Sequence, residues 1–259
     1  MEISVIVLTL NEEEHIATCL KALLNQSFPR DKYEIIVSDG YSHDRSVEIA
    51  KKYADKVVVT KKRGIWYGRN YGARFAKGKY LVFIDADTIA KKDYLKIVHE
   101  HFEKGYIGVS TIFSFSNRNL RLTLAEPVAN AYYLLHRYLW GYSYLLGFNI
   151  CISKKAFDEV GGFKKYELED IEMSKELKSK GKTILIAKRM VLTSPRRLEA
   201  FGLFGTLRYY LEMLYIQKKN VDPQKHKKIF KYGGTYFKVD KDFKKKGKKG
   251  KKFCVKPKD

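Results

Sequence analysis

Short apolar runs alternate with segments of helical periodicity along the first part of the chain. Residues 3–8 form a continuous, largely β-branched run, typical of a strand buried on both faces. Residues 12–24 then place apolar side chains at helical spacing. Strands separated by helices indicate an α/β fold with a mostly parallel central sheet, flanked by helices. Further strands are predicted at 33–38, 56–60 and 80–84, and helices at 46–53 and 66–76.

Beyond residue 93 the alternation is less regular. A strand is predicted at 107–115, followed by a long, aromatic-rich helical stretch over 120–146. Residues 218–259 are rich in lysine, so we expect a folded domain over 1–217 and a partly flexible basic extension over 218–259. The remaining predicted elements are strands at 148–153, 183–187 and 190–193, and helices at 155–160, 169–180 and about 202–218.

Polar side chains follow three of the predicted strands at the point where each strand ends. Thr9 and Asn11 follow the first strand, Asp39 the second, and Asp85 with Asp87 the fourth. Because the carboxyl ends of parallel strands meet at one edge of a sheet, we expect these side chains to converge. Neighbouring carboxylates repel unless a cation joins them, and oxygen ligands suit Mg²⁺ or Mn²⁺. The pattern favours a metal site, and the alternative is a loop that carries two acids by chance.

The chain is strongly basic, with a net charge of +22 over 259 residues. Such a charge attracts nucleotides, nucleic acids or anionic lipids, so charge alone leaves the partner open. The three cysteines are far apart, which argues against both a zinc site and a disulfide framework. The N-terminal apolar run is not preceded by cations and is followed at once by acids. We interpret it as a strand rather than a signal peptide, and we expect a cytoplasmic protein.

The aromatic segment 131–152 is interrupted by His136 and Arg137, so we do not expect it to span a membrane. Its aromatic residues, Trp140 among them, would pack the helix onto the sheet or present flat faces to a sugar or a lipid. A peripheral contact with the anionic cytoplasmic face of a membrane fits this segment and the basic extension, and a solvated tail is the alternative. Arg196 and Arg197 would bind a diphosphate, a lipid phosphate or the acceptor. The alternative is that they are surface arginines on an exposed loop.

Five segments, in this order, resemble motifs of glycosyltransferase family 2, whose members are inverting enzymes with a GT-A fold. They are the opening strand and turn at 5–12, the second strand and acidic turn at 34–44, Gly68-Arg69-Asn70 with the residues that follow, Asp85-Ala86-Asp87, and Gly161-Gly162-Phe163 with Glu169-Asp170. The resemblance covers about residues 3–187. It implies a GT-A (Rossmann-like) domain with a helical acceptor-side and C-terminal extension.

The resemblance also implies roles for individual residues. Asp87, together with Asp85, would hold Mg²⁺ or Mn²⁺. Asp170 would be the general base, and Glu169 would support it or contact the acceptor. Without the resemblance, these two acids read as the first turn of a helix, where the helix dipole favours negative charge. The residues implied to bind the nucleotide-sugar are Thr9, Asn11, Glu12, Asp39, Arg69, Asp85 and Ala86, with Arg69 beside the base or the phosphates.

The activity implied is transfer of a sugar from a UDP- or GDP-sugar to a hydroxyl or phosphate of a saccharide or lipid acceptor. Ser38 and Tyr41 depart from the family pattern, which has an acid and a small serine there, so the nucleotide base stays open. A rival hypothesis is a basic protein that binds nucleic acid or an anionic surface without transferase activity. Acids at the strand ends would repel a polyanion, so nucleic acid is disfavoured. A transferase-like binding module without activity is a third alternative.

Overall fold

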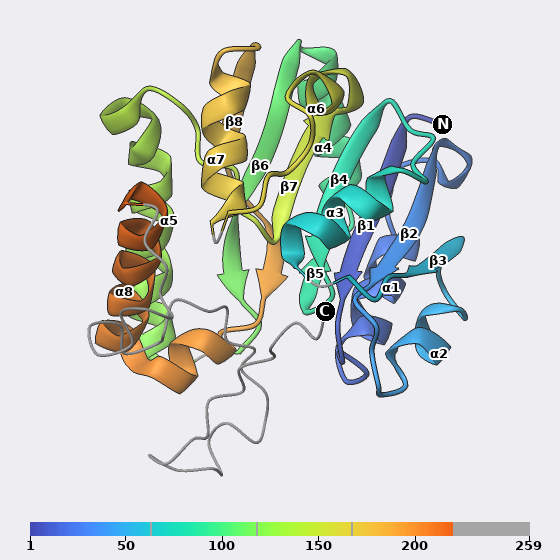
Figure 1. The fold of residues 1–259 in the computed structure, drawn as a ribbon, viewed down its shortest axis with the longest axis horizontal. Helices are drawn as coiled ribbons and strands as arrows, with labels where there is room; N and C mark the ends of the chain where they lie inside the picture. The colour runs from blue at the N-terminus through green and yellow to red at the C-terminus, as the bar shows by residue number, and fades with distance from the viewer. Residues whose placement is uncertain (63, 118, 167, 220–259) are drawn as a thin grey trace. The chain divides into compact units, whose positions relative to one another are not determined.

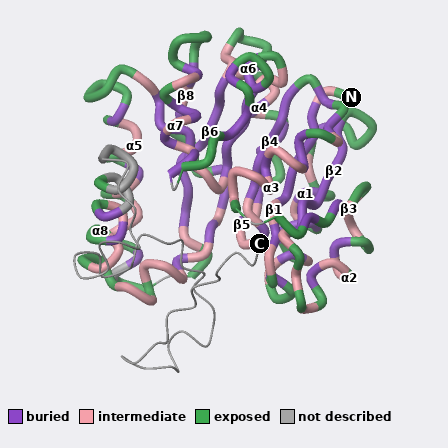
Figure 2. The backbone as a smooth tube through the Cα atoms, in the orientation of Figure 1, coloured by how far each residue is buried: buried purple, intermediate pink, exposed green. Residues whose placement is uncertain are grey.

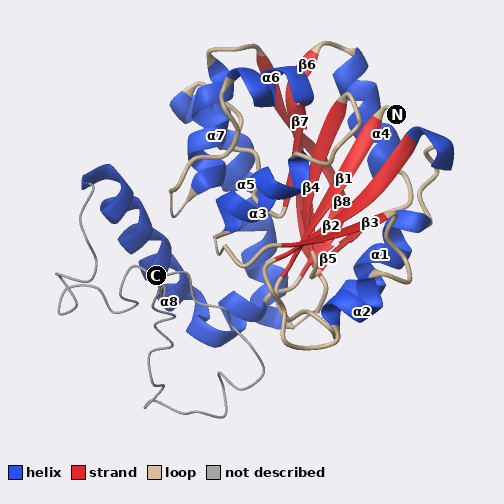
Figure 3. Ribbon diagram, turned by 45° about the vertical axis from the view of Figure 1, so that its right-hand side comes forward, coloured by secondary structure: helices blue, strands red, loops and turns tan. Residues whose placement is uncertain are grey.

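The computed structural model describes residues 1–62, 64–117, 119–166 and 168–219. The chain divides into two compact units, residues 1–194 and 195–259. The first unit is built on one twisted sheet with helices on both of its faces (Figures 1 and 3). The predicted extension over 218–259 lies outside the described residues, apart from its first two.

The N-terminal half of the first unit alternates strands and helices. Its elements are β1 (Ile3–Thr9), α1 (Ile16–Leu24), the 3₁₀ turn η1 (Arg30–Lys32), β2 (Tyr33–Asp39), α2 (Ser46–Ala50), β3 (Lys56–Val59), α3 (Ile65–Ala73) and β4 (Tyr80–Asp85). The remainder comprises β5 (Thr88–Ala90), α4 (Tyr94–Glu103), β6 (Tyr106–Phe115), α5 (Leu120–Trp140), β7 (Asn149–Ser153), α6 (Lys154–Glu159), α7 (Glu169–Lys178) and β8 (Lys182–Thr193). The second unit begins with α8 (Arg196–Lys219), which is broken at Gly202 and which our prediction groups with residues 1–217.

The strand order is β3-β2-β1-β4-β7-β6-β8-β5. Strand β1 runs parallel to both β2 and β4, β2 runs parallel to β3, and β6 runs parallel to β8. Only β7 and β5 run against their neighbours. The α/β fold with a mostly parallel sheet is therefore confirmed.

Helices α1 and α5 are both shorter than the sequence predicts, and each difference has a local cause. Helix α1 starts at Ile16 rather than at residue 12, because the Glu12 carbonyl accepts hydrogen bonds from the amides of His15 and Ile16 in a separate turn. Helix α5 ends at Trp140 rather than at residue 146. Gly141 stops it by adopting a left-handed conformation with φ of 72°, and its amide donates to the Arg137 carbonyl.

The sequence prediction also misses or divides three elements. The two short strands expected at 183–187 and 190–193 are one strand, β8, which bulges between Ile186 and Val191. Lys188 and Arg189, which separate the two predicted strands, occupy this bulge. Helix α4 is not predicted, although its buried Tyr94, Leu95 and Val98 follow helical spacing. Strand β5 is not predicted because its three residues are too few to show a period.

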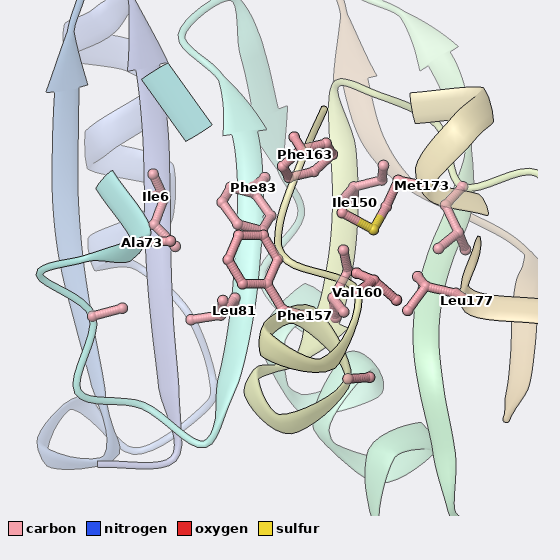
Figure 4. Packing of buried hydrophobic residues seen from close by; sticks show 14 of the residues in the cluster. Ile6, Ala73, Leu81, Phe83, Ile150, Phe157, Val160, Phe163, Met173 and Leu177 are labelled. Carbon is pink, nitrogen blue, oxygen red and sulfur yellow. The ribbon is translucent and has the colours of Figure 1, made fainter. Parts of the chain in front are cut away.

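Hydrophobic side chains from both faces of the sheet form the core, which appears as the buried centre of Figure 2. On one face, residues of β1, β4 and β7 pack against helices α3, α6 and α7 (Figure 4). Phe83, Phe157 and Phe163 meet there with ring centroids 5.1 to 5.9 Å apart, in tilted and edge-to-face arrangements that aromatic rings favour. This cluster ties the N-terminal strands to the later helices.

Strand β6 pairs with β8 on one edge, and on its other edge side chains replace the neighbouring strand beyond Val109. The side-chain amide of Asn149 accepts from the backbone amide of Thr111 and donates to the backbone carbonyl of Thr111, both at 3.0 Å. The Asn130 side chain makes the same pair of bonds with Phe113, at 3.2 and 2.9 Å. The Glu126 carboxylate accepts from the Phe115 amide at 2.9 Å. The backbone groups of alternate β6 residues are thus hydrogen-bonded to polar side chains, two of which come from α5.

These bonds fix which face of α5 is turned to the sheet. Glu126 and Asn130 lie one helical turn apart and both point toward β6. The helix therefore buries polar side chains, and its apolar residues lie largely outside. In the described part of the chain, no helix has the length and apolar character that crossing a bilayer requires.

We expect Asn130→Ala to lower the free energy of unfolding by roughly 2 to 4 kcal/mol. The substitution leaves the buried Phe113 amide and carbonyl without partners, and each such group costs about 1–3 kcal/mol. Urea unfolding followed by circular dichroism measures the change. Asn25→Ala, at an exposed position after α1, is the matched control. Equal stability of the two variants would show that Asn130 does not hold α5 to the sheet.

Candidate functional site

The polar strand ends converge as the sequence predicts. Strand β1 lies between β2 and β4, with Thr9 paired opposite Asp39 and Leu8 opposite Asp85. The strand order changes direction here, and a crevice beyond the carboxyl ends of strands at such a point is where α/β sheets bind ligands. The Thr9 hydroxyl is buried and meets no hydrogen-bond partner among the described residues. Such a group is uncommon in a folded protein.

Asp85, Ala86 and Asp87 form the turn that leads from β4 to β5. Ala86 is buried, and its amide donates to the Leu8 carbonyl at 3.0 Å. Asp85 and Asp87, on either side of it, are both partly exposed. The turn thus holds two carboxylates at the surface of the sheet edge while its middle residue is fixed to β1.

The thiol of Cys19 lies beneath this turn, 3.8 Å from the Asp85 carbonyl oxygen. Burial, together with the charges of Asp87 and Asp85, raises the pKa of Cys19 far above its ordinary value. The side chain therefore stays a neutral thiol. Cys19 is buried beneath the turn, so the side chains that the turn exposes are the two carboxylates.

A loop after β2 is held to the turn after β1 by side-chain hydrogen bonds. Both carboxylate oxygens of Asp39 accept from Ser42, one from its amide and the other from its hydroxyl. The Asn11 side chain accepts from the His43 amide at 2.8 Å, and the Asn11 amide donates to Ser42. Asn11 and Tyr41 have φ of 50° and 70°, which few residues other than glycine adopt. Asp39 is fully buried and shapes this loop.

Glu12 belongs to the same assembly. It is buried, and its amide donates to the Ser46 hydroxyl at 2.7 Å. This bond joins the turn after β1 to the start of helix α2. In the structure Glu12 thus connects the two segments, and its contact with a nucleotide-sugar stays a prediction.

A single buried guanidinium connects the two acidic motifs. Arg69 of α3 is 2% exposed and donates to the Glu169 carboxylate and, at 2.8 Å, to the Gly147 carbonyl. Its Nη2 atom is also 3.9 Å from Oδ1 of Asp85. Burial by itself lowers the pKa of Arg69, but the charges of Glu169, Asp85 and Asp170 outweigh burial and raise it. The Arg69 side chain is therefore a permanent cation between the carboxylates.

Asp170 is held by the segment that follows α5. Its Oδ2 atom accepts from the Gly147 amide at 3.2 Å and from the Tyr144 hydroxyl at 3.4 Å. Its Oδ1 atom accepts from the Ile171 amide at 2.9 Å in the first turn of α7. Burial raises the pKa of Asp170 above the ordinary aspartate value, although the Arg69 charge opposes the shift. A carboxylate with a raised pKa is a better proton acceptor than an ordinary aspartate.

Glu169 differs from Asp170 in its surroundings. It is buried, and its charge is matched by the ion pair with Arg69. Burial raises the pKa of Glu169, and Arg69 acts in the opposite direction. Both acids stand in the first turn of α7, as the helix-dipole interpretation predicts, but their partners are specific side chains and backbone groups.

Asn70, next to Arg69, fixes the Gly161-Gly162-Phe163 segment. Its side chain accepts from the Phe163 amide at 2.9 Å and donates to the Phe163 carbonyl at 2.7 Å. Gly162 has φ of 72°, and a Cβ atom there would lie 2.7 Å from Oδ1 of Asn70. The Phe163 ring lies under the Arg69 guanidinium, 4.9 Å from its centre. Two neighbouring residues of α3, Arg69 and Asn70, thus hold the segments around Gly147 and Phe163, both of which precede helix α7.

Three further residues singled out in the sequence lie outside the segments described above. Trp140 ends helix α5, where its ring stacks on His136 with centroids 4.6 Å apart. Arg196 and Arg197 belong to the second unit. Within that unit Arg197 donates to the Tyr210 hydroxyl at 3.1 Å. Phosphate or acceptor contacts by these residues stay predictions.

Sequence reasoning misses three residues that the structure brings to the site. Asn70, Tyr144 and Gly147 hold Phe163, Asp170 and Arg69 respectively. In the sequence, Asn70 is one residue of a motif, and Tyr144 is one of many aromatic residues in its segment. Gly147 within the aromatic segment is the available signal for these contacts, because a glycine there marks a turn between helix α5 and strand β7.

Comparison with known proteins supports this reading of the motifs. The model of the family described as glycosyl transferase family 2 matches residues 4–161. A dolichyl N-acetyl-alpha-D-glucosaminyl phosphate 3-beta-D-2,3-diacetamido-2,3-dideoxy-beta-D-glucuronosyltransferase of Methanococcus voltae is 28% identical over 139 residues, covering 49% of this chain and 43% of that protein. The poly(ribitol-phosphate) beta-N-acetylglucosaminyltransferase TarS of Staphylococcus aureus is 34% identical over 102 residues, covering 37% of this chain and 18% of TarS.

Solved structures share the fold at low sequence identity. A crystal structure of S. aureus TarS 1-349 in complex with UDP-GlcNAc aligns with a TM-score of 0.60 and 20% identity, covering 75% of this chain and 58% of that one. The mannosyltransferase PcManGT from Pyrobaculum calidifontis, in complex with GDP-Man and Mn²⁺, aligns with a TM-score of 0.60 and 21% identity, covering 82% and 64%. The chain spans less than two thirds of these proteins.

We expect Arg69→Met to lower the free energy of unfolding by about 3–5 kcal/mol, because removing one partner of a buried ion pair leaves an uncompensated charge. The loss should shrink as the pH falls and Glu169 becomes protonated. Chemical unfolding at neutral and acidic pH measures both effects. Arg74→Met, which removes an exposed arginine at the end of the same helix, is the control. A loss that is the same at both pH values would show that charge pairing is not the reason for it.

Proposed function

The chain belongs to glycosyl transferase family 2, and on that premise we propose that it is an inverting glycosyltransferase. It moves a sugar from a UDP- or GDP-sugar to a hydroxyl or phosphate of a saccharide or lipid acceptor. The observation that carries the proposal is the buried Arg69, which joins the Asp85 turn to Glu169 and Asp170. Two acidic motifs separated by more than eighty residues thereby become one site.

Asp170 acts as the general base. The acceptor hydroxyl loses its proton to the Asp170 carboxylate as its oxygen bonds to the anomeric carbon and the bond from that carbon to the diphosphate breaks. A mechanism with retention would need a second carboxylate as nucleophile. Glu169 is unsuited to that role because it is buried and ion-paired to Arg69. A single displacement with inversion is therefore the reaction that this pair of acids supports.

Asp87 and Asp85 would hold a divalent cation. Two partly exposed carboxylates in one turn form an oxygen donor set, which fits Mg²⁺ or Mn²⁺. When bound, the metal supplies a Lewis acid that stabilises charge on the departing diphosphate. The GDP-Man and Mn²⁺ bound by the similar PcManGT support this assignment.

Thr9, Asn11 and Asp39 would shape the nucleotide pocket. The Asp39–Ser42 and Asn11–His43 hydrogen bonds order the loop that presents Tyr41 at the surface. The Thr9 hydroxyl supplies a polar group that the described residues leave without a partner. UDP-GlcNAc in TarS and GDP-Man in PcManGT support a nucleotide-sugar donor, and they leave the base open between uracil and guanine.

We expect calorimetric titration to show that one of UDP, GDP or their common sugar conjugates binds in the presence of Mn²⁺. Asp87→Ala should weaken that binding at least about tenfold, because the diphosphate loses its metal-mediated contact. Asp31→Ala, at an exposed position in η1, is the control. If none of these nucleotides binds with Mn²⁺ present, the transferase proposal fails and the basic surface becomes the main indication of function.

We also expect Asp170→Asn to reduce kcat by about 10²–10⁴-fold with unchanged nucleotide affinity, since general-base catalysis contributes that much. In the wild type, kcat/KM should fall as the pH drops through the raised pKa of Asp170, because only the deprotonated carboxylate accepts a proton. The acid limb should therefore lie above the range of an ordinary aspartate. Glu172→Gln, in the same turn of α7, should keep both activity and pH profile. Persistence of the acid limb in Asp170→Asn would assign the base to another residue.

A further inference from the structure

Helix α5 carries an exposed apolar surface on the side opposite to β6. We call this surface the α5 stripe. Its members recur every three or four residues, so they lie along one side of the helix, and each is between 48% and 77% exposed. At 1.5 Å per residue the stripe extends for roughly 28 Å. It consists of Leu120, Leu124, Val128, Tyr132, Leu135 and Leu139.

The outward position of these residues follows from the hydrogen bonds of β6. Glu126 and Asn130 must face the strand to satisfy its backbone, and the leucines therefore face away from it. A contiguous apolar surface of this length is unfavourable in water and marks an interaction site. The stripe therefore calls for a partner with an apolar side.

The charges around the stripe identify the chemistry of that partner. Glu126 is the one acid in α5, and it is turned inward, where Arg189 also binds it at 3.0 Å. Arg137 is exposed in the last turn of the helix. The chain has a net charge of +22, and residues 220–259 contribute fifteen lysines against four aspartates. A chain that combines an exposed leucine surface with an excess of positive charge suits an anionic lipid bilayer.

The ends and neighbours of the stripe have the composition of an interfacial helix. Tyr138 and Trp140, 84% and 49% exposed, follow its C-terminal end, and rings of this kind favour the headgroup region of a bilayer. In the second unit, α8 repeats the pattern, with Leu203, Leu207 and Leu211 exposed at a spacing of four residues. Each unit of the chain thus presents an amphipathic helix of its own.

We propose that the α5 stripe docks the protein on the surface of an anionic membrane. The helix lies in the plane of the interface, with its leucines in the region between headgroups and acyl chains. Lysine and arginine side chains add attraction to anionic headgroups of about 1 kcal/mol for each cation close to the surface. This proposal concerns location and does not depend on the identity of the sugar donor or acceptor.

Flotation of the full chain with vesicles tests the proposal. The wild type should float with vesicles of phosphatidylcholine containing 30% phosphatidylglycerol, and much less with phosphatidylcholine alone. Leu124→Glu with Val128→Glu should weaken binding to the anionic vesicles at least tenfold. The control is Leu24→Glu with Val59→Glu, which makes the same substitutions at exposed positions on α1 and β3 and changes the net charge equally. Circular dichroism confirms that both double variants are folded.

Tryptophan fluorescence supplies a second measurement that is independent of mutating the stripe. Trp66→Phe leaves Trp140 as the single tryptophan of the chain. Its emission should shift to shorter wavelength on binding and should be quenched by brominated acyl chains, because Trp140 follows the stripe into the interface. An unchanged Trp140 emission on bound vesicles would overturn the orientation we propose.

Other outcomes separate this proposal from its alternatives. Equal vesicle binding by the two double variants would overturn it and would assign lipid binding to the lysine-rich residues alone. Conversion of a wild-type dimer to a monomer by the stripe variant, with vesicle binding unchanged, would show that the stripe contacts a second copy instead. Nucleotide titration without vesicles is a separate measurement, so loss of either function leaves the other testable.

Discussion

The site depends on the balance of charge around Arg69. Its guanidinium is buried beside Glu169, Asp85 and Asp170, and the buried charge of Glu169 would be costly without it. Because Arg69 sits on α3, while its partners end β4 and begin α7, the ion pairs also set how these elements approach one another. Asn70 extends the arrangement to Phe163, whose ring packs into the core beneath the guanidinium. The geometry of the candidate site and the packing of the core are therefore coupled at a single pair of adjacent residues.

Strand β6 imposes a second constraint, which explains the unusual orientation of helix α5. Strand β7 pairs with β6 only at Gly108 and Val109, so the later residues of β6, which pair with β8 on one edge, need other partners on the edge that faces β7. Amide and carboxylate side chains meet that need, and two of them come from α5. Hydrogen bonding of a strand edge thus outweighs the usual burial of the apolar side of a helix. The exposed leucines are a consequence, and they become useful if the protein works at a membrane.

The strands and the polar residues at their ends could be predicted, because buried parallel strands read as continuous apolar runs that stop at Thr9, Asp39 and Asp85. The convergence of these residues followed from topology. The place of Arg69 could not be predicted, since its partner Glu169 is 100 residues away and no local pattern joins them. The orientation of α5 escaped prediction for a similar reason: its cause lies in another element. Helix α4, by contrast, shows a regular apolar spacing and could have been found.

The two proposals meet in the short segment between α5 and β7. Trp140 ends the helix that carries the stripe, and Tyr144 and Gly147, a few residues later, hold the carboxylate of Asp170. Tyr144 is buried, so this connection is packed rather than loose. A membrane contact at α5 would therefore lie a few residues, through an ordered segment, from the residues that hold Asp170, the proposed general base. That arrangement favours an acceptor presented at the bilayer surface, and among the acceptors considered it gives preference to a lipid-linked one over a free saccharide.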